Sequence, residues 1–297
     1  MPMAPPVTAR MVEPRFLQLI ELLGVDRLRD HMAHGKLLHI PAPGFDPATL
    51  ITWAELEQAI DERRIPHKTF KAFAGYRPVD IAALGGVDRG RIVPATLRKL
   101  AAERTTFVFN FIDQICPHFW TFAHEAEQIL GDYVTLGAIV SHGTETGIEP
   151  HHDPESLILV QVTGEKLWRF FDPPGPDASE RPIAEVLMRP GDLLFVPPDL
   201  RHVCAANGFS LHFGALIHHQ RGIAWTRELV ASLQDDNDFS APLLRFLGPE
   251  AFEQRVASYR ATLLKRLAET DAAALLDRRL ARRLRGPDFA PPALADG

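Results

Sequence analysis

The sequence contains only two cysteines among its 297 residues. Cys116 and Cys204 match neither the spacing of a zinc-binding motif nor the framework of a disulfide-stabilised secreted domain. We therefore expect a reducing, cytoplasmic environment. The first residues, MPMAPPVTARMVEPRF, lack the apolar segment of a secretory signal peptide. No run approaches about 18 apolar residues, so we expect no membrane span.

Basic residues are not in excess either. The chain has 32 Lys and Arg against 38 Asp and Glu, a net charge of −6, which argues against general nucleic-acid binding. Its composition is that of an ordinary globular protein, with 46% hydrophobic and 24% charged residues. The length suits one large domain, or one domain with an appendage. The 25 prolines and many short apolar runs favour a loop-rich β core.

Helical patterns surround a region of short strands. Residues 14–33 repeat apolar side chains at helical spacing, and Thr52 with Glu55 forms a predicted capping box. Between residues 132 and 218, short apolar runs alternate with Gly, Pro, Asp and Asn turns, which is typical of an antiparallel sandwich or barrel. We predict a mainly β fold with α-helices. Its predicted parts are a disordered N-terminus (1–13), a β-rich domain (14–221), a helical region (222–286) and a disordered tail (287–297).

Two separate segments supply candidate metal ligands. His151 and Asp153 are two residues apart, so in an extended segment they point the same way and His152 points away. His202 follows RPGDLLFVPPDLR, in which a Gly-Asp turn leads into a strand that prolines end. Two histidines and one carboxylate on a β scaffold form the ligand set of non-haem Fe(II) oxygenases. The alternative is that these side chains are solvated polar residues at the end of a hairpin, because a chain with 13 histidines will often contain His-x-Asp by chance.

Lys166 is the third unusual feature. Strand alternation puts it on one face with Trp168 and Phe170, and a face with two large aromatic side chains is expected to be interior. A buried lysine is costly unless it is paired. Either its ammonium group reaches solvent at the strand end, or a cosubstrate that bears a carboxylate pairs with it. A metal site nearby favours the cosubstrate.

Residues 105–218 resemble the JmjC/cupin-type Fe(II)- and 2-oxoglutarate-dependent oxygenases, most closely the bacterial-type ribosomal oxygenases, which are cupin-like hydroxylases. The motifs PHHDPESLILVQVTGEKLW and RPGDLLFVPPDLRH carry this resemblance. It implies a double-stranded β-helix (jelly-roll or cupin) core with N-terminal helices and a C-terminal helical bundle. It makes His151, Asp153 and His202 the iron ligands, and Lys166 the partner of the distal carboxylate of 2-oxoglutarate.

The same resemblance extends to further side chains around the cosubstrate. It places Asn110 near the pocket, and it makes Ser141 or Ser210 a hydroxyl donor to the distal carboxylate. His212 shares a strand face with Ser210, and it is either a pocket residue or a core histidine. Cys204 is expected to be a small buried thiol.

The resemblance implies a dioxygenase that uses Fe(II), 2-oxoglutarate and O2 to hydroxylate a side chain of a protein or peptide. Two alternatives stay open: a tailoring hydroxylase for a natural-product peptide, amino acid or other small molecule, and a non-catalytic metal-binding cupin. Ribosomal oxygenases carry a further winged-helix domain, and we expect none here, which favours the small-molecule alternative. In this family the helices after the barrel often dimerise, so we expect residues 222–286 to form a homodimer.

Overall fold

The computed structural model describes residues 15–42, 44–115, 117–143, 147–172, 181–233, 239, 242–271 and 273–274. They form two compact units, one up to His218 and the other from His219. The predicted disordered ends, 1–13 and 287–297, lie outside the described residues, as do residues 275–286 of the predicted helical region. In the part of the chain that is described, no helix combines the length and apolar character needed to cross a membrane.

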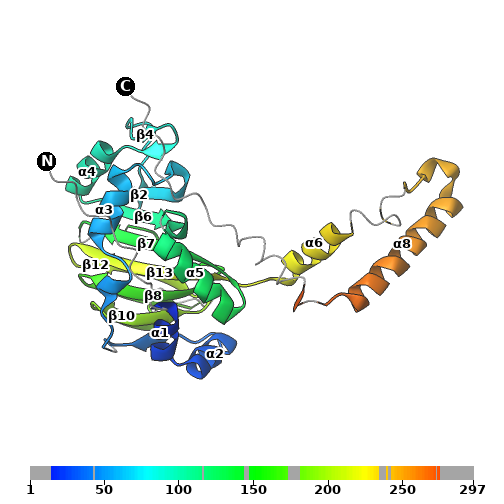
Figure 1. The fold of residues 1–297 in the computed structure, drawn as a ribbon, viewed down its shortest axis with the longest axis horizontal. Coiled ribbons are helices and arrows are strands. Elements are labelled where there is room, and N and C mark those ends of the chain that lie inside the picture. The colour runs from blue at the N-terminus through cyan, green and yellow to red at the C-terminus, as the bar shows by residue number, and fades with distance from the viewer. Residues whose placement is uncertain are drawn as a thin grey trace, which may run out of the picture. The chain divides into compact units, whose positions relative to one another are not determined.

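Two antiparallel sheets form the centre of the first unit (Figure 1). The larger has the strand order β1-β11-β8-β13-β7-β6-β2-β3, and the smaller has the order β10-β9-β12. Together they make the expected double-stranded β-helix, so the predicted fold class is confirmed. The strands of these sheets are β1 (Leu38–Ile40), β2 (Phe70–Ala74), β3 (Arg77–Pro78), β6 (Thr106–Asn110), β7 (Tyr133–Ser141), β8 (Ser156–Thr163), β9 (Lys166–Phe171), β10 (Ala184–Met188), β11 (Leu193–Val196), β12 (Arg201–Ala206) and β13 (Ser210–His218).

Helices cover the outer face of the larger sheet. The Phe122 ring of α5 lies 5.1 Å from the Phe16 ring of α1 and 5.3 Å from the Phe213 ring of β13, so the three elements share one core. A small two-stranded sheet, β4 (Val87–Asp88) and β5 (Arg91–Ile92), completes the unit. The helices are α1 (Arg15–Leu23), α2 (Val25–Ala33), α3 (Trp53–Asp61), α4 (Pro94–Ala102) and α5 (Pro117–Leu130), with α6 (Gly222–Ser232) and α8 (Pro249–Glu269) in the second unit.

Of the two predictions for the N-terminal helices, one is confirmed and one is wrong. The capping box is confirmed, since the Glu55 backbone N–H donates to Thr52 Oγ1 (3.2 Å) and the Thr52 N–H donates to Glu55 Oε2 (2.7 Å). The single helix predicted over 14–33 is wrong, because Gly24 has φ 79° and separates α1 from α2. The break lets Leu23 and Leu28, on different helices, both be buried.

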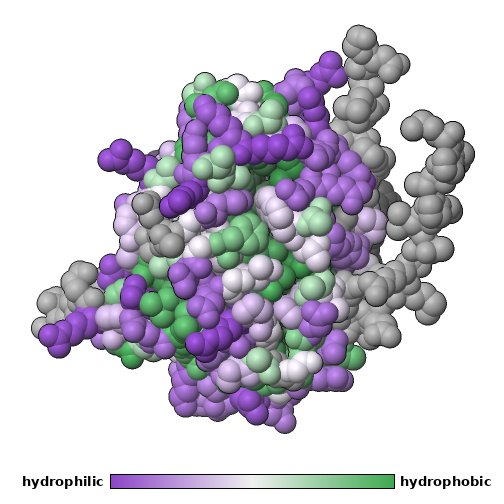
Figure 2. All heavy atoms as spheres, turned by 90° about the vertical axis from the view of Figure 1, so that its left-hand side faces the viewer, coloured by the Kyte–Doolittle hydropathy of each residue, from purple (hydrophilic) through white to green (hydrophobic). Residues whose placement is uncertain are grey.

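The apolar side chains are divided between two buried clusters. The larger lies between the helices and the eight-stranded sheet. The smaller lies between the two sheets, and its members are Leu157, Leu159, Trp168, Phe170, Val186, Met188, Leu194 and Val196. One face of the molecule is mainly polar, with apolar patches near its middle (Figure 2). The smaller cluster matters most for function because it borders the site described below.

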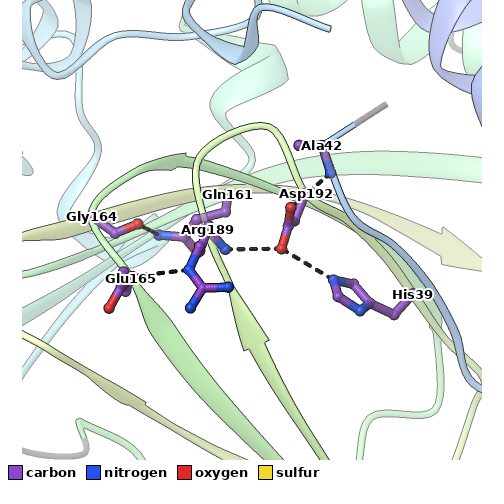
Figure 3. A network of polar contacts seen from close by, with 7 residues as sticks. All are labelled: His39, Ala42, Gln161, Gly164, Glu165, Arg189 and Asp192. Carbon is purple, nitrogen blue, oxygen red and sulfur yellow. Dashed lines mark hydrogen bonds and ion pairs between the residues drawn. The ribbon is translucent and has the colours of Figure 1, made fainter. Parts of the chain in front are cut away.

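Asp192 joins the turn before β11 to the N-terminal strand (Figure 3). Its carboxylate accepts hydrogen bonds from the backbone N–H groups of Arg189 (3.0 Å) and Ala42 (2.8 Å). The His39 Nε2 atom lies 3.1 Å from the same carboxylate. Gly191 has φ 94°, a conformation that L side chains rarely adopt, and it completes the turn. The Pro-Gly-Asp sequence therefore holds the start of β11 in place.

Replacing Asp192 with Ala is expected to lower the free energy of unfolding by about 2–4 kcal/mol, because two backbone donors lose a charged acceptor. Urea denaturation measures this change. Glu185→Ala is the control, since it removes an exposed carboxylate paired with Arg169 at 2.7 Å and is expected to change stability by less than about 1 kcal/mol. Equal effects of the two substitutions would contradict the role of Asp192.

Candidate metal centre

Backbone hydrogen bonds bring the three predicted metal ligands together. The His151 N–H donates to the His202 carbonyl (3.0 Å), and the His202 N–H donates to the His151 carbonyl (2.7 Å). The Asp199 N–H donates to the Asp153 carbonyl (2.7 Å). The segment that carries His151 and Asp153 is therefore tied to the start of β12, which carries His202.

The side chains of these residues converge on one point. Asp153 Oδ2 lies 3.8 Å from His151 Nε2 and 3.6 Å from His202 Nε2. The two imidazole centroids are 4.6 Å apart. One ligand atom from each residue lies within 4.8 Å of the other two. The neighbouring His152 is exposed, as the alternation predicted.

Each histidine is held in the tautomer that metal binding needs. The Nδ1 atom of His151 lies 2.8 Å from the Glu149 carbonyl, and Nδ1 of His202 lies 2.9 Å from the Leu200 carbonyl. A carbonyl oxygen only accepts, so each Nδ1 carries the hydrogen and each Nε2 keeps its lone pair. Burial lowers the pKa of His202 below its ordinary value, which favours the neutral ring.

The donor set fits a divalent transition metal. Two imidazole nitrogens and one carboxylate oxygen suit iron, cobalt or zinc, whereas magnesium and calcium prefer oxygen ligands. Three protein ligands leave coordination positions open, as in catalytic rather than structural sites. The arrangement of His151, Asp153 and His202 can therefore bind a metal together with an exogenous ligand.

A cavity of about 260 Å³ opens beside these ligands. Its wall includes a row of side chains that strand register brings side by side across β2, β6, β7 and β13: Lys71, Val108, Ile139 and His212. Asn110 also lines the cavity, next to the paired glycines Gly137 and Gly214. Sequence reasoning did not select Lys71 or the two glycines. Counting alternate residues along each strand would have selected these three residues only if the pairing of the strands had been known.

Lys166 is buried beside this cavity. It is 1% exposed and shares the inner face of β9 with Trp168 and Phe170, as predicted. Its Nζ atom lies 3.1 Å from Nδ1 of His212, and no carboxylate pairs with it among the described residues. Burial lowers the pKa of the Lys166 ammonium group, and burial also raises the pKa of the nearby Cys204 thiol. A buried amine in this position can pair with a ligand carboxylate.

Ser141 and Ser210 lie in a polar row at one end of the sheet. They face each other across β7 and β13, and both are buried. Thr106 Oγ1 donates to Ser141 Oγ (3.3 Å), and Gln161 Nε2 donates to Ser210 Oγ (2.9 Å). Neither serine is among the described residues that line the cavity. Both hydroxyls thus contact the protein itself, and their binding to a cosubstrate stays a prediction.

Comparison with known proteins agrees with this geometry. Residues 113–222 match the JmjC domain family. This region of the chain is therefore similar to a JmjC domain. It is 28% identical over 110 residues to ribosomal oxygenase 2 of Bos taurus, covering 34% of this chain and 24% of that protein. It is 25% identical over 140 residues to ribosomal oxygenase 1 of Rattus norvegicus, covering 41% and 23%. The chain thus spans about a quarter of the length of these relatives.

Solved structures of the Escherichia coli ribosomal oxygenase YcfD share the fold. The complex of YcfD with cobalt and 2-oxoglutarate superposes with a TM-score of 0.60 at 14% identity, over 92% of this chain and 74% of YcfD. The complex with cobalt and succinic acid gives a TM-score of 0.60 over 91% and 73%. The chain therefore shares the fold of YcfD.

Removing one metal ligand is expected to weaken binding of Co(II) by about 100-fold or more, because even side chains that only orient a ligand contribute 10- to 100-fold. The variants are His151→Ala and Asp153→Ala, and titration calorimetry with Co(II) gives the affinity. His152→Ala is the matched control, since its side chain is exposed beside the site. Native affinity in Asp153→Ala would exclude this residue as a ligand.

Proposed function

We propose that the protein is an Fe(II)- and 2-oxoglutarate-dependent dioxygenase that hydroxylates a side chain of a protein or peptide. The observation that carries this proposal is the buried Lys166, which has no carboxylate partner among the described residues and lies beside the cavity of the metal-ligand set. Such an amine suits the distal carboxylate of 2-oxoglutarate. The JmjC domain and the cobalt and 2-oxoglutarate named for YcfD support the same cofactors.

The residues have distinct roles in this proposal. His151, Asp153 and His202 would hold Fe(II) and leave positions for the cosubstrate and O2. When bound, iron and 2-oxoglutarate supply the oxidising chemistry for an unactivated C–H bond, with succinate and CO2 as coproducts. Lys166 would orient the distal carboxylate by a charge-assisted contact, and that carboxylate would raise the pKa of Lys166 against the effect of burial.

The cavity size favours a protein or peptide over a whole small molecule. Pockets that enclose drug-sized ligands are typically about 300–1,000 Å³. The cavity here is about 260 Å³ and would also hold the cosubstrate, so a single inserted side chain fits best. Apolar Leu157, Leu159 and Leu216 line it and would exclude water from that side chain. The names of the ribosomal oxygenase relatives support a protein substrate.

We also infer that the second unit joins two copies of the chain. Within its described residues, α8 has no buried side chain, and large apolar side chains are exposed. Exposed apolar surface of this kind marks interaction sites. The exposed fractions are 59% for Ile223, 53% for Val230, 84% for Phe246, 56% for Leu247 and 67% for Leu264.

A cytoplasmic location is part of the same proposal. Cys204 is a free thiol in the described part of the chain. This half-buried thiol forms no disulfide with another described residue, which suits a reducing compartment.

Succinate formation from 2-oxoglutarate with added Fe(II) tests the proposed activity. The native protein is expected to turn over slowly without a prime substrate, and His151→Ala, Asp153→Ala and Lys166→Ala are expected to lose at least about 100-fold, since each removes a metal ligand or the charged partner. Arg169→Ala is the control on the same strand, because Arg169 pairs with Glu185 away from the cavity. If the native protein neither binds nor consumes 2-oxoglutarate, the cosubstrate role of Lys166 is wrong, and a metal-binding cupin with another ligand becomes the better hypothesis.

The mass in solution tests the proposed homodimer. Light scattering coupled to size exclusion is expected to give twice the 33.1 kDa chain mass for the native protein. Placing charge on the exposed apolar surface, in Phe246→Asp with Leu247→Asp, is expected to give a monomer. Leu84→Asp is the control, since Leu84 is 51% exposed but lies in the first unit. A monomeric native protein at micromolar concentration would contradict the proposal.

A further inference from the structure

A carboxylate, an imidazole and a hydroxyl form a chain at the end of the large sheet where β13 ends. The Nδ1 atom of His218, on β13, lies 3.1 Å from Glu155 Oε1, and its Nε2 atom lies 2.8 Å from Thr135 Oγ1 on β7. The side chains of Glu155 and His218 are 20% and 29% exposed, and Thr135 is 3% exposed. None of these three residues belongs to the metal-ligand set or lines the cavity.

The order of carboxylate, imidazole and hydroxyl is that of a hydrolase triad, but the surroundings do not suit such catalysis. A nucleophile must reach its substrate, whereas Thr135 is buried in the sheet and away from the cavity lining. The contacts therefore act within the protein. A carboxylate can only accept, so Nδ1 of His218 carries a hydrogen and donates it to Glu155. In the neutral ring, Nε2 then accepts from the Thr135 hydroxyl, which a stiff β-branched side chain presents.

Glu155 lies two residues beyond the candidate metal ligand Asp153. Residues 152–155 belong to no strand, and β8 begins only after them. Among the described residues, the Asp153 carboxylate accepts no hydrogen bond from a backbone or hydroxyl group, and its ion-pair partners are the other two ligands, His151 and His202. The direction of this carboxylate therefore depends on where the backbone of residues 152–155 is held.

Contacts on both sides of this segment hold its backbone. The Asp199 N–H donates to the Asp153 carbonyl, and the Glu155 side chain is bound to His218. We infer that Glu155, His218 and Thr135 act together as positioning residues that aim the Asp153 carboxylate at the metal. This inference rests on the metal centre of the proposed function. Groups that only orient a metal ligand contribute about 10- to 100-fold to metal affinity, although they do not contact the ion.

Binding of Co(II) tests this inference without turnover. His218→Leu and Glu155→Leu are each expected to weaken Co(II) affinity by about 10- to 100-fold in titration calorimetry. Both substitutions are also expected to change the visible absorption spectrum of the bound Co(II), because a displaced carboxylate alters the ligand field. A loss of stability alone would leave the spectrum of the folded, Co(II)-loaded protein unchanged.

Two matched variants separate positioning from other effects. Glu155→Gln removes the same negative charge but keeps an oxygen that accepts from His218. Its Co(II) affinity is expected to stay within about threefold of the native value, with the native spectrum, because the contact is retained. His124→Leu removes another half-buried histidine that pairs with a carboxylate, since His124 lies 3.7 Å from Glu127 on α5, and it is expected to change neither readout.

Each outcome decides for or against positioning. Equal losses in Glu155→Gln and Glu155→Leu would mean that the charge of Glu155 acts rather than its contact with His218. Native affinity and spectrum in His218→Leu would mean that the contact does not position Asp153. Either result would overturn the inference. A native protein that binds no Co(II) would instead overturn the metal centre, and the proposed function with it.

A second variant keeps the test decisive if His218→Leu does not fold, as thermal melting reports. Thr135→Val keeps the shape of the side chain and removes only the hydroxyl that contacts His218. It is expected to weaken Co(II) affinity by about 3- to 10-fold, because one neutral hydrogen bond is lost, and to change the Co(II) spectrum in the same direction as Glu155→Leu. Native values of both would contradict the inference.

Discussion

The site depends on the two backbone hydrogen bonds that join His151 and His202. They connect a long loop to the small sheet and fix the distance between two residues that are 51 positions apart. Each imidazole is then oriented by a carbonyl of its own segment, at Glu149 or Leu200. Because main-chain atoms make these contacts, the fold itself fixes the positions of the metal ligands. Binding of a metal would therefore require little further ordering of the protein.

A second constraint acts between the two sheets. The amine of Lys166 is held inside the protein against a neutral imidazole, with burial opposing its charge. Burying the amine in this way costs free energy, because the neutral imidazole supplies no charge opposite to that of an ammonium group. A dianionic ligand would supply the missing negative charge, and its binding would stabilise the fold by mass action. Stability and cosubstrate affinity are thus linked through one buried contact.

The sequence was informative wherever a local rule decides the outcome. The capping box of Thr52, the inner face of Lys166, Trp168 and Phe170, and the alternating β pattern all follow from the periodicity of a single element. The break at Gly24 was missed because apolar spacing continues across it and a single glycine in a helix costs only about 1 kcal/mol. The contact between Lys166 and His212 joins different sheets, so no local pattern could have revealed it.

Strand β13 lies between β7 and β8 and supplies three of the residues that line the cavity. His212, Gly214 and Leu216 alternate along it toward the cavity, while the metal ligands come from other segments. These three cavity-lining positions are therefore encoded separately from the residues that would bind the metal. Evolution, or an engineer, could change the volume and polarity of the pocket through three positions of one strand without touching a ligand of the metal. That separation makes the scaffold adaptable to new substrates.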